Sequence, residues 1–428
     1  MGKYKQINLS RGGKLYYVKN NISKSTMVRI SFDCGSRCDT IPGVAHFTEH
    51  MFFTGTKTMA REQINKKYFD FIGSNASTGS GDIVFEANLF TKEFEEYVKT
   101  VAMLVTESTF EQKEVEKEAR VIQQEIARSK DKYNRIADFK NRFNLTGLDL
   151  YKDYGALGTE ESVATIKSVD IKNFVEKYFI ANNLEVFVTT QLSAKKVKQI
   201  IENNLVKKLP VNNNFQKLPY FINYVQNSNF KHLETNKIGK NYIFINFKHN
   251  YNIFDFDFRA KASVTMDMVN DYSSGILKLL REQKSLVYSG GFNAYIKNDK
   301  EFVTTFYTEC VSKNVNAVIE TVAEYFKNIV KVGFTEDQLK QAKRNIKYGR
   351  DTREPRVGRL LGKLSDFGLY GKVLKNEISD RMKTVTLEEC NELFKELFFN
   401  SEISYTVYGD IKKEELISDK KFDELFIR

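Results

Sequence analysis

The sequence contains no tryptophan and only four prolines, four cysteines and four histidines among 428 residues. So few cysteines in a chain of this length exclude the disulfide framework of a small secreted protein, and we expect a reducing, cytoplasmic setting. Cys34 and Cys38, in the segment CGSRC, could form a redox pair or supplement a metal site. Burial as small apolar residues explains them more simply.

Long hydrophobic runs are also missing. No segment approaches the roughly 20 apolar residues that span a bilayer, and residues 1–21 have no apolar core typical of an export signal. The formal charge is +11, from 66 basic and 55 acidic residues. The lysines are nevertheless spread along the chain, without a basic block or a nucleic-acid-binding motif. We therefore expect no membrane span and no nucleic-acid partner.

Strand-like and helical segments alternate along the chain, and the same order occurs twice. Residues 92–131 read as a helix, a short break and a charged helix, and residues 316–351 repeat this pattern with Phe110 and Phe334 at the breaks. Residues 183–202 and 402–418 each read as a strand, a turn and a polar helix. Internal similarity of this kind indicates tandem copies of one unit.

The duplication predicts two homologous domains of about two hundred residues each. The asparagine-rich segment between the copies contains two of the four prolines, a composition typical of a linker. We predict a first domain at residues 1–210, a linker at 211–230 and a second domain at 231–428.

Two of the four histidines lie four residues apart in GVAHFTEHMFFTGT, residues 43–56. On a helix, His46, Glu49 and His50 fall within an arc of roughly 100°. The two imidazoles can both reach one zinc ion at about 2.0–2.1 Å, and Glu49 would stand beside the metal, able to accept a proton from water. The complete H-x-x-E-H spacing is the inverzincin pattern and appears in the first copy only.

A catalytic zinc site requires a third protein ligand. The segment EVEKEARVIQQEI carries Glu118 and Glu125, which share one helix face because they are seven residues apart. Apolar neighbours such as Val121 and Ile122 indicate a partly buried carboxylate at Glu125, as expected of a metal ligand. Glu118 could then orient a ligand from outside the coordination sphere. Spacing alone leaves this choice open.

The segments GSRCDTIPGVAHFTEHMFFTGT and EKEARVIQQEI resemble the pitrilysin family of inverzincin metallopeptidases, which includes insulin-degrading enzyme and mitochondrial processing peptidase. The resemblance covers essentially the whole chain. It implies that Glu125 is the third zinc ligand, that Glu118 supports the site, and that each chain binds one Zn²⁺. It also implies an α+β fold of two tandem ferredoxin-like α/β domains with antiparallel sheets.

Two further segments resemble the substrate-binding parts of that family. GSNASTGSGDIVFEA resembles the strand whose exposed edge pairs with an extended peptide, through Asn75 and Ala76. LREQKSLVYSGG in the second domain resembles an arginine–tyrosine pair, here Arg281 and Tyr288, which is expected to bind substrate and to reach the carbonyl oxygen as it becomes negative. The family usually has glycine where this chain has Ser285.

These observations predict a zinc-dependent endopeptidase that acts on peptides, either in general degradation or in the maturation of one dedicated peptide. Larger members of the family enclose substrate with four such domains in one chain. A two-domain chain is therefore expected to form a homodimer, or a heterodimer with a related chain. The alternative function is a non-catalytic subunit that binds peptides or supports a partner peptidase.

Overall fold

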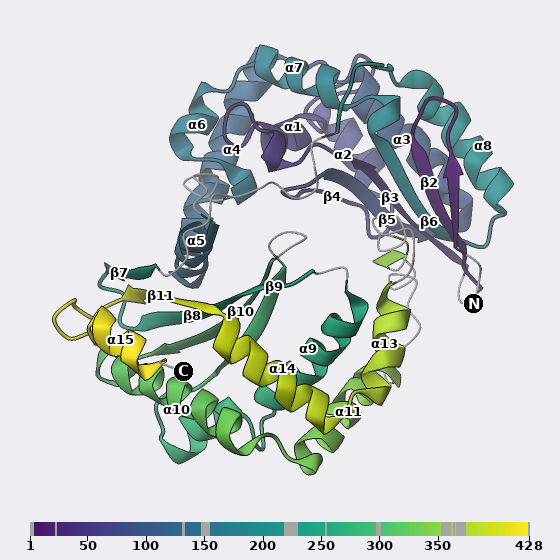
Figure 1. The fold of residues 1–428 in the computed structure, drawn as a ribbon. Helices are drawn as coiled ribbons and strands as arrows, with labels where there is room; N and C mark the ends of the chain where they lie inside the picture. The colour runs from purple at the N-terminus through teal and green to yellow at the C-terminus, as the bar shows by residue number, and fades with distance from the viewer. Residues whose placement is uncertain are drawn as a thin grey trace. The chain divides into compact units, whose positions relative to one another are not determined.

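The computed structural model describes residues 4–21, 24–130, 133–146, 155–217, 230–252, 255–296, 301–351, 361–362, 364 and 374–426. The chain divides into two compact units (Figure 1). Unit 1 consists of residues 1–131, 149–220 and 354–374, and unit 2 consists of residues 132–148, 221–353 and 375–428.

Unit 1 combines one sheet with several helices. Its strands are β1 (Lys5–Asn8), β2 (Lys14–Lys19), β3 (Ser25–Phe32), β4 (Asn75–Thr78), β5 (Ile83–Phe90) and β6 (Leu184–Thr190). Its α-helices are α1 (Val44–Met51), α2 (Arg61–Phe69), α3 (Phe94–Glu107), α4 (Gln112–Lys130), α6 (Glu160–Thr165), α7 (Ser168–Tyr178) and α8 (Ala194–Asn204).

Unit 2 has the same kind of composition. Its strands are β7 (Lys231–Thr235), β8 (Asn241–Asn250), β9 (Gly290–Ile296), β10 (Glu301–Cys310) and β11 (Glu402–Gly409). Its α-helices are α5 (Tyr133–Thr146), α9 (Phe256–Val269), α10 (Val315–Val332), α11 (Glu336–Asp351), α13 (Leu374–Thr384), α14 (Leu387–Asn400) and α15 (Asp419–Leu425).

The two sheets share one topology. The order is β1-β2-β6-β3-β5-β4 in unit 1 and β7-β11-β8-β10-β9 in unit 2, so β2, β6, β3, β5 and β4 correspond to β7, β11, β8, β10 and β9. In both sheets the first pair of this shared series, β2–β6 or β7–β11, is parallel and the other neighbours are antiparallel. The predicted duplication and the α+β fold with antiparallel-dominated sheets are confirmed.

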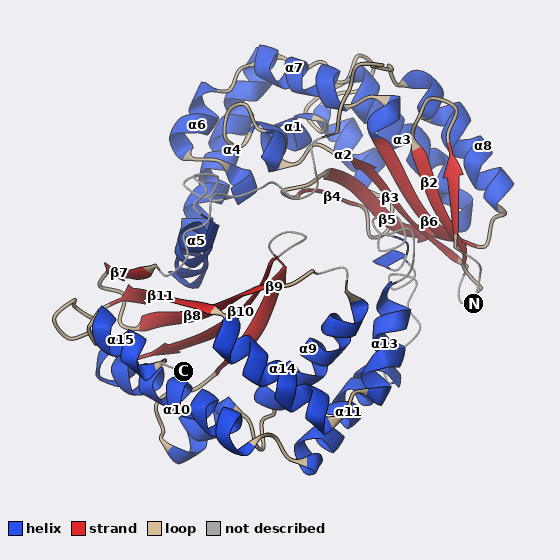
Figure 2. Cartoon of the chain, in the orientation of Figure 1, coloured by secondary structure: helices blue, strands red, loops and turns tan. Residues whose placement is uncertain are grey.

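Helices cover one face of each sheet (Figure 2). In unit 1, inward side chains such as Ile30 and Phe85 pack with Phe47 of α1 and Val101 of α3 in one hydrophobic core. Alternate residues of a strand point to opposite faces, and the second face of β2 carries further buried apolar side chains. The sheet is therefore buried on both faces along β2, and Phe187 of the neighbouring strand β6 lies in the same second cluster as Tyr16.

Segments from opposite halves of the sequence cover these second faces. In unit 1, Tyr16 packs with Leu361 and Leu364, which follow α11 in the chain. In unit 2, Ala137 of α5, which follows α4, packs with Tyr242 on β8. The two units thus exchange corresponding segments, and they do not coincide with the two halves of the sequence.

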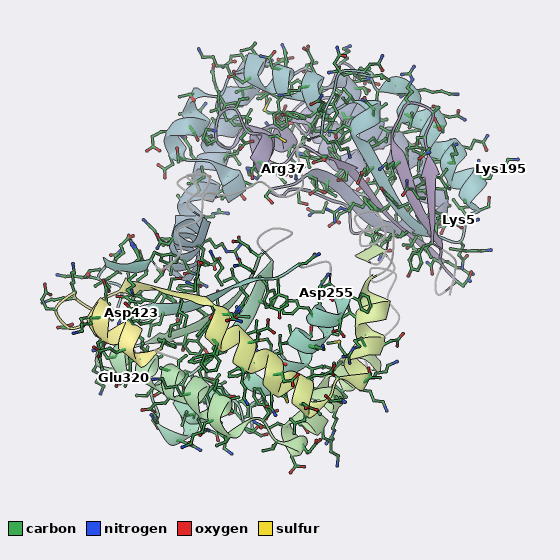
Figure 3. All side chains as sticks on the ribbon, in the orientation of Figure 1. Lys5, Arg37, Lys195, Asp255, Glu320 and Asp423 are labelled. Carbon is green, nitrogen blue, oxygen red and sulfur yellow. The ribbon has the colours of Figure 1, made fainter. Side chains whose placement is uncertain are left out.

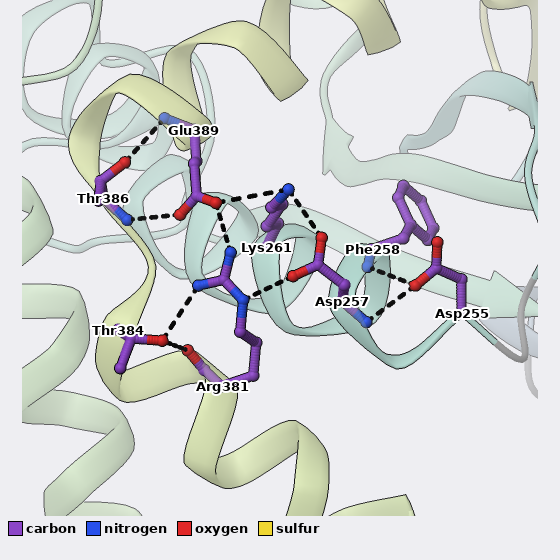
Figure 4. Close-up of polar contacts among 8 residues, drawn as sticks. All are labelled: Asp255, Asp257, Phe258, Lys261, Arg381, Thr384, Thr386 and Glu389. Atoms are coloured by element: carbon purple, nitrogen blue, oxygen red, sulfur yellow. Dashed lines mark hydrogen bonds and ion pairs between the residues drawn. The ribbon is translucent and has the colours of Figure 1, made fainter.

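An ion-pair network joins three helices of unit 2 (Figure 4). Arg381 of α13 donates to Asp257 of α9 at 2.5 Å and also contacts Glu389 of α14. Lys261 lies 2.7 Å from Asp257, and Thr386 caps α14 through a reciprocal pair of hydrogen bonds with Glu389. The network fixes the start of α14 against α9 and α13, shortly after the chain re-enters unit 2 at Lys375.

Two further predictions concern the linker and the helix near the C-terminus. Most of the predicted linker, residues 218–229, lies outside the described residues. The prediction of a turn and then a polar helix after the strand in residues 402–418 is wrong, because residues 410–418 form turns and loop and the next helix, α15, begins at Asp419. Charged side chains such as Lys195 and Asp423 lie on the outer surfaces of their units (Figure 3).

Among the described residues, none of the helices is both long and apolar enough to cross a membrane.

Cys34 and Cys38 are core residues. Both side chains are buried in the hydrophobic cluster of unit 1, and neither forms a disulfide. Burial raises the pKa of each thiol, which keeps both protonated near neutral pH and unreactive as nucleophiles. The interpretation as buried apolar residues fits this arrangement.

Candidate metal centre

The H-x-x-E-H motif forms the short, almost wholly buried helix α1. Asp39 accepts hydrogen bonds from the backbone N–H of Gly43 at 2.7 Å and of Ala45 at 3.0 Å, and so satisfies N–H groups at the start of the helix. Gly43 has φ 89°, and a Cβ there would lie 2.7 Å from the carbonyl oxygen of Leu157. Only glycine fits this close approach, which fixes where α1 begins.

His46, His50 and Glu125 converge, with their ligand atoms within 4.8 Å of one another. Glu125 Oε2 lies 3.8 Å from His46 Nε2 and 3.7 Å from His50 Nε2. Among the described residues, Glu125 forms ion pairs with these two histidines alone. One carboxylate therefore faces two imidazole nitrogens, which is a set of ligands that zinc prefers.

The histidines differ in their proton affinity. Burial and the neighbouring charge of His50 lower the pKa of His46 to about 3, so His46 stays neutral and retains a lone pair at physiological pH. Burial alone would lower the pKa of His50, but the hydrogen bond and charge of Glu118 outweigh it and raise that pKa. The bond runs from His50 Nδ1 to Glu118 Oε1 at 2.9 Å, which leaves Nε2 to face Glu125.

Glu118 is far more buried than Glu125 on helix α4, with 5% of its surface exposed. Its second oxygen accepts a hydrogen bond from Arg61 Nη2 at 2.9 Å, and the same nitrogen lies 3.0 Å from Glu114. Burial would raise the pKa of Glu118, but the bonds from His50 and Arg61 lower it. Glu118 is thus held ionised as a support for His50.

The structure corrects the predicted surroundings of Glu125 and adds Arg61, a residue that the sequence did not indicate. Val121 is 47% exposed and does not help to bury Glu125, whose side chain is itself 45% exposed. Arg61 was not anticipated, because it lies on α2, and no spacing in the sequence connects α2 to α4. The available signal was an arginine at the first position of the helix that follows the motif.

Glu49 points to the same region from α1 and is 8% exposed. Burial raises the pKa of its carboxyl group, which favours proton uptake. Its Oε2 accepts a hydrogen bond of 2.6 Å from the hydroxyl of Thr78, at the end of β4. Thr78 was also missed by sequence reasoning, although it lies two residues after Ala76 on the same side of the strand.

Strand β4 is the last strand of its sheet and pairs only with β5 among the described residues. Its Asn75 is exposed, and Ala76 packs partly against the core. Gly79 N–H bonds to Asp82 at 2.9 Å, so the alternation of an antiparallel ladder directs the backbone N–H and C=O of Ala76 and Thr78 away from β5. This edge is available to an added strand.

Arg281 and Tyr288 lie together in unit 2. The Arg281 guanidinium is 4.7 Å from the centre of the Tyr288 ring, and Tyr288 is 76% exposed. Ser285 between them has φ 52°, in the left-handed region, where a side chain costs about 1–2 kcal/mol that glycine avoids. The departure to serine therefore adds strain to a turn that glycine would form freely.

The cluster of His46, His50 and Glu125 fits zinc by its chemistry and spacing. Ligands at 2.0–2.1 Å in a tetrahedron lie about 3.3–3.5 Å apart, and the carboxylate-to-imidazole distances of 3.7 and 3.8 Å are close to that. Three protein ligands leave one tetrahedral position for water or substrate, as in catalytic zinc sites.

Models of one peptidase family match two successive segments of the chain. "Insulinase (Peptidase family M16)" matches residues 15–146, and "Peptidase M16 inactive domain" matches residues 165–346. The uncharacterized zinc protease YmxG of Bacillus subtilis is 24% identical over 426 residues, which cover 92% of this chain and 95% of that protein.

Solved structures share the fold. A Pseudomonas fluorescens protein described as a peptidase M16 inactive domain superposes with a TM-score of 0.81 at 16% identity, over 96% of this chain and 99% of that one. The periplasmic protease PqqL of Escherichia coli superposes with a TM-score of 0.79 at 19% identity, over 99% of this chain and 50% of that one. The fold therefore occurs both in chains of this length and in chains about twice as long.

Proposed function

Because the chain belongs to the insulinase family of peptidases, family M16, we propose that it is a zinc-dependent endopeptidase that cleaves extended peptides. The observation that carries this proposal is the cluster of His46, His50 and Glu125 with Glu49 beside it on the same helix. His46, His50 and Glu125 hold one Zn²⁺. When bound, zinc polarises the scissile carbonyl and lowers the pKa of water toward about 7.

The protein groups supply the proton transfers and the orientation. Glu49 accepts the proton of the attacking water and then delivers it to the leaving amine, for which its raised pKa suits it. Glu118 holds His50 by its Nδ1–H, so that Nε2 keeps its direction. The substrate main chain adds to the edge of β4 that carries Asn75 and Ala76, through the outward backbone groups of Ala76 and Thr78, and such pairing reads little of the side-chain sequence.

Removal and return of the metal tests the proposal. Chelation should abolish cleavage of an unstructured peptide, and one equivalent of zinc per chain should restore it. A zinc-loaded protein that cleaves no peptide, alone or mixed with a related chain, would instead support the non-catalytic subunit that binds peptides. The presence of all the motif residues favours the enzyme.

Arg281 and Tyr288 of unit 2 are proposed to contact the substrate carbonyl as it becomes negative. Tyr288→Phe should lower turnover by about 10²–10³-fold, the usual effect of losing one oxyanion donor, with unchanged zinc content. Arg281→Ala should also lower turnover. Steady-state kinetics with elemental analysis measures both effects. Tyr272→Phe is the matched control, because Tyr272 is another exposed tyrosine near Arg281. Wild-type turnover in Tyr288→Phe would remove the tyrosine from the site.

A homodimer is proposed as the working assembly, with a heterodimer as the alternative. The present chain spans half of PqqL, so one PqqL chain is about twice as long as this one. Two copies of this chain would supply the same amount of structure, and exclusion of bulk water by the assembly favours hydrolysis at zinc. Light scattering on the purified chain, combined with cleavage of a peptide and of a large folded protein, decides this. A monomer active on both would contradict it.

A cytoplasmic location and a peptide substrate are proposed on separate grounds. Four buried cysteines without a disulfide are compatible with a reducing, cytoplasmic location, which fractionation of the source cells would test. Edge-strand binding permits both general peptide degradation and the maturation of one dedicated peptide. Comparison of cleavage rates on unrelated peptides separates these roles, since a dedicated enzyme should discriminate strongly among them.

A further inference from the structure

We propose that Thr78 is a positioning residue that orients Glu49 and couples it to peptide binding on β4. This inference rests on the proposed peptidase function. Its direct evidence is the 2.6 Å hydrogen bond from the Thr78 hydroxyl to Glu49 Oε2. The bond joins two elements that are otherwise separate in the sequence, the motif helix α1 and the edge strand β4.

The bond restrains a carboxylate that would otherwise rotate. Among the described residues, Thr78 donates the side-chain hydrogen bond that Glu49 accepts, and this bond uses only one of the two carboxylate oxygens. The other oxygen, Oε1, stays available to accept a proton. A base held in one orientation does not lose conformational freedom at the moment of reaction, and this preorganisation contributes to the rate.

Thr78 also belongs to the surface that the peptide would cover. Its side chain points toward α1, while the ladder register directs its backbone N–H and C=O away from β5, toward the unpaired edge. An added peptide strand would bond to these backbone groups and immobilise the residue. Peptide binding would thereby fix the hydroxyl that holds Glu49, so that binding energy from the extended substrate increases turnover.

A purely structural role for Thr78 predicts something different. Valine has nearly the same shape as threonine, so Thr78→Val keeps the packing and removes only the hydroxyl. If the hydroxyl merely satisfied a buried acid, its loss would change stability and leave turnover as in the wild type. If it positions the base, kcat should fall while KM and zinc content stay the same.

The experiment compares Thr78→Val with Thr78→Ser on a long peptide and on a truncated one that does not extend along β4. We expect Thr78→Val to lower kcat on the long peptide about 10–100-fold, the range for losing a hydrogen bond to a charged group, and Thr78→Ser to restore most of it. The wild type should turn over the long peptide faster than the truncated one, and Thr78→Val should lose this advantage.

Thr26→Val is the matched control, because it removes a hydroxyl contact of the same 2.6 Å length, to Thr190, elsewhere in the same sheet. It should leave kcat unchanged. Thermal unfolding and zinc content identify any variant that fails to fold, and Thr78→Ala then serves as the second variant. Affinity of the zinc-free protein for the long peptide should be equal in wild type and Thr78→Val.

The possible results distinguish the positioning role, the coupling to β4 and the proposed function from one another. Wild-type kcat in folded Thr78→Val overturns the positioning role, and an equal loss of kcat on both peptides overturns the coupling to β4. Absence of cleavage by the zinc-loaded wild type contradicts the proposed function itself, which is a different outcome from either of these.

Discussion

Replacement of Glu49 by glutamine is expected to remove nearly all peptide hydrolysis while zinc stays bound. The amide has nearly the same shape as the carboxylate but cannot accept a proton from water, and a positioned general base contributes about 10²–10⁴-fold to the rate. Glu49 is not among the three converging ligand atoms, so the metal should remain. Peptide cleavage measured beside elemental zinc analysis gives both quantities.

The same variant separates the two functional hypotheses when it is compared with the wild type. An enzyme cleaves its peptide with glutamate and not with glutamine at this position, whereas a peptide-binding subunit without activity cleaves it with neither. If Glu49→Gln cleaves at a rate near that of wild type, Glu49 is not the base. If it loses zinc together with activity, its role is structural, and the loss of cleavage reveals nothing about proton transfer.

The second large effect is expected at Glu125. Glu125→Gln should weaken zinc binding the most, because it replaces the charged oxygen that faces both imidazoles at 3.7 and 3.8 Å. Glu118→Gln should weaken it less, by about 10–100-fold, as is usual for a residue that orients a ligand from outside the coordination sphere. Competition with a chelator of known affinity measures both dissociation constants.

Glu116→Gln is the matched control for this comparison. Glu116 lies on the same helix α4 but is exposed, and among the described residues its carboxylate accepts a hydrogen bond from Gln112 while Arg120 donates to its backbone carbonyl. Its replacement should leave zinc affinity unchanged. If Glu118→Gln removes the metal and Glu125→Gln retains it, the two roles are reversed.

The fold was largely predictable because its signals are local and repeated. The sequence pattern located α3, α4, β6 and β11, and the repetition of a helix, a break and a second helix indicated a duplicated α+β chain. The structure confirms this with two sheets of the same strand order. The exchange of α5 and of the segment after α11 was not predictable, since no local pattern records which sheet a helix packs against.

In the site, too, the contacts within one helix were predictable from the sequence, and the contacts between elements were not. The sequence by itself determined that His46, Glu49 and His50 share a helix face, because the turn of a helix fixes spacing over four residues. It also placed Glu118 and Glu125 on one face of α4. Only the tertiary structure decided that Glu125 faces both Nε2 atoms, that Glu118 meets Nδ1 of His50, and that Arg61 and Thr78 complete these contacts. Such pairings depend on how α1, α2, α4 and β4 pack, and packing direction is a property of the whole core rather than of any one segment.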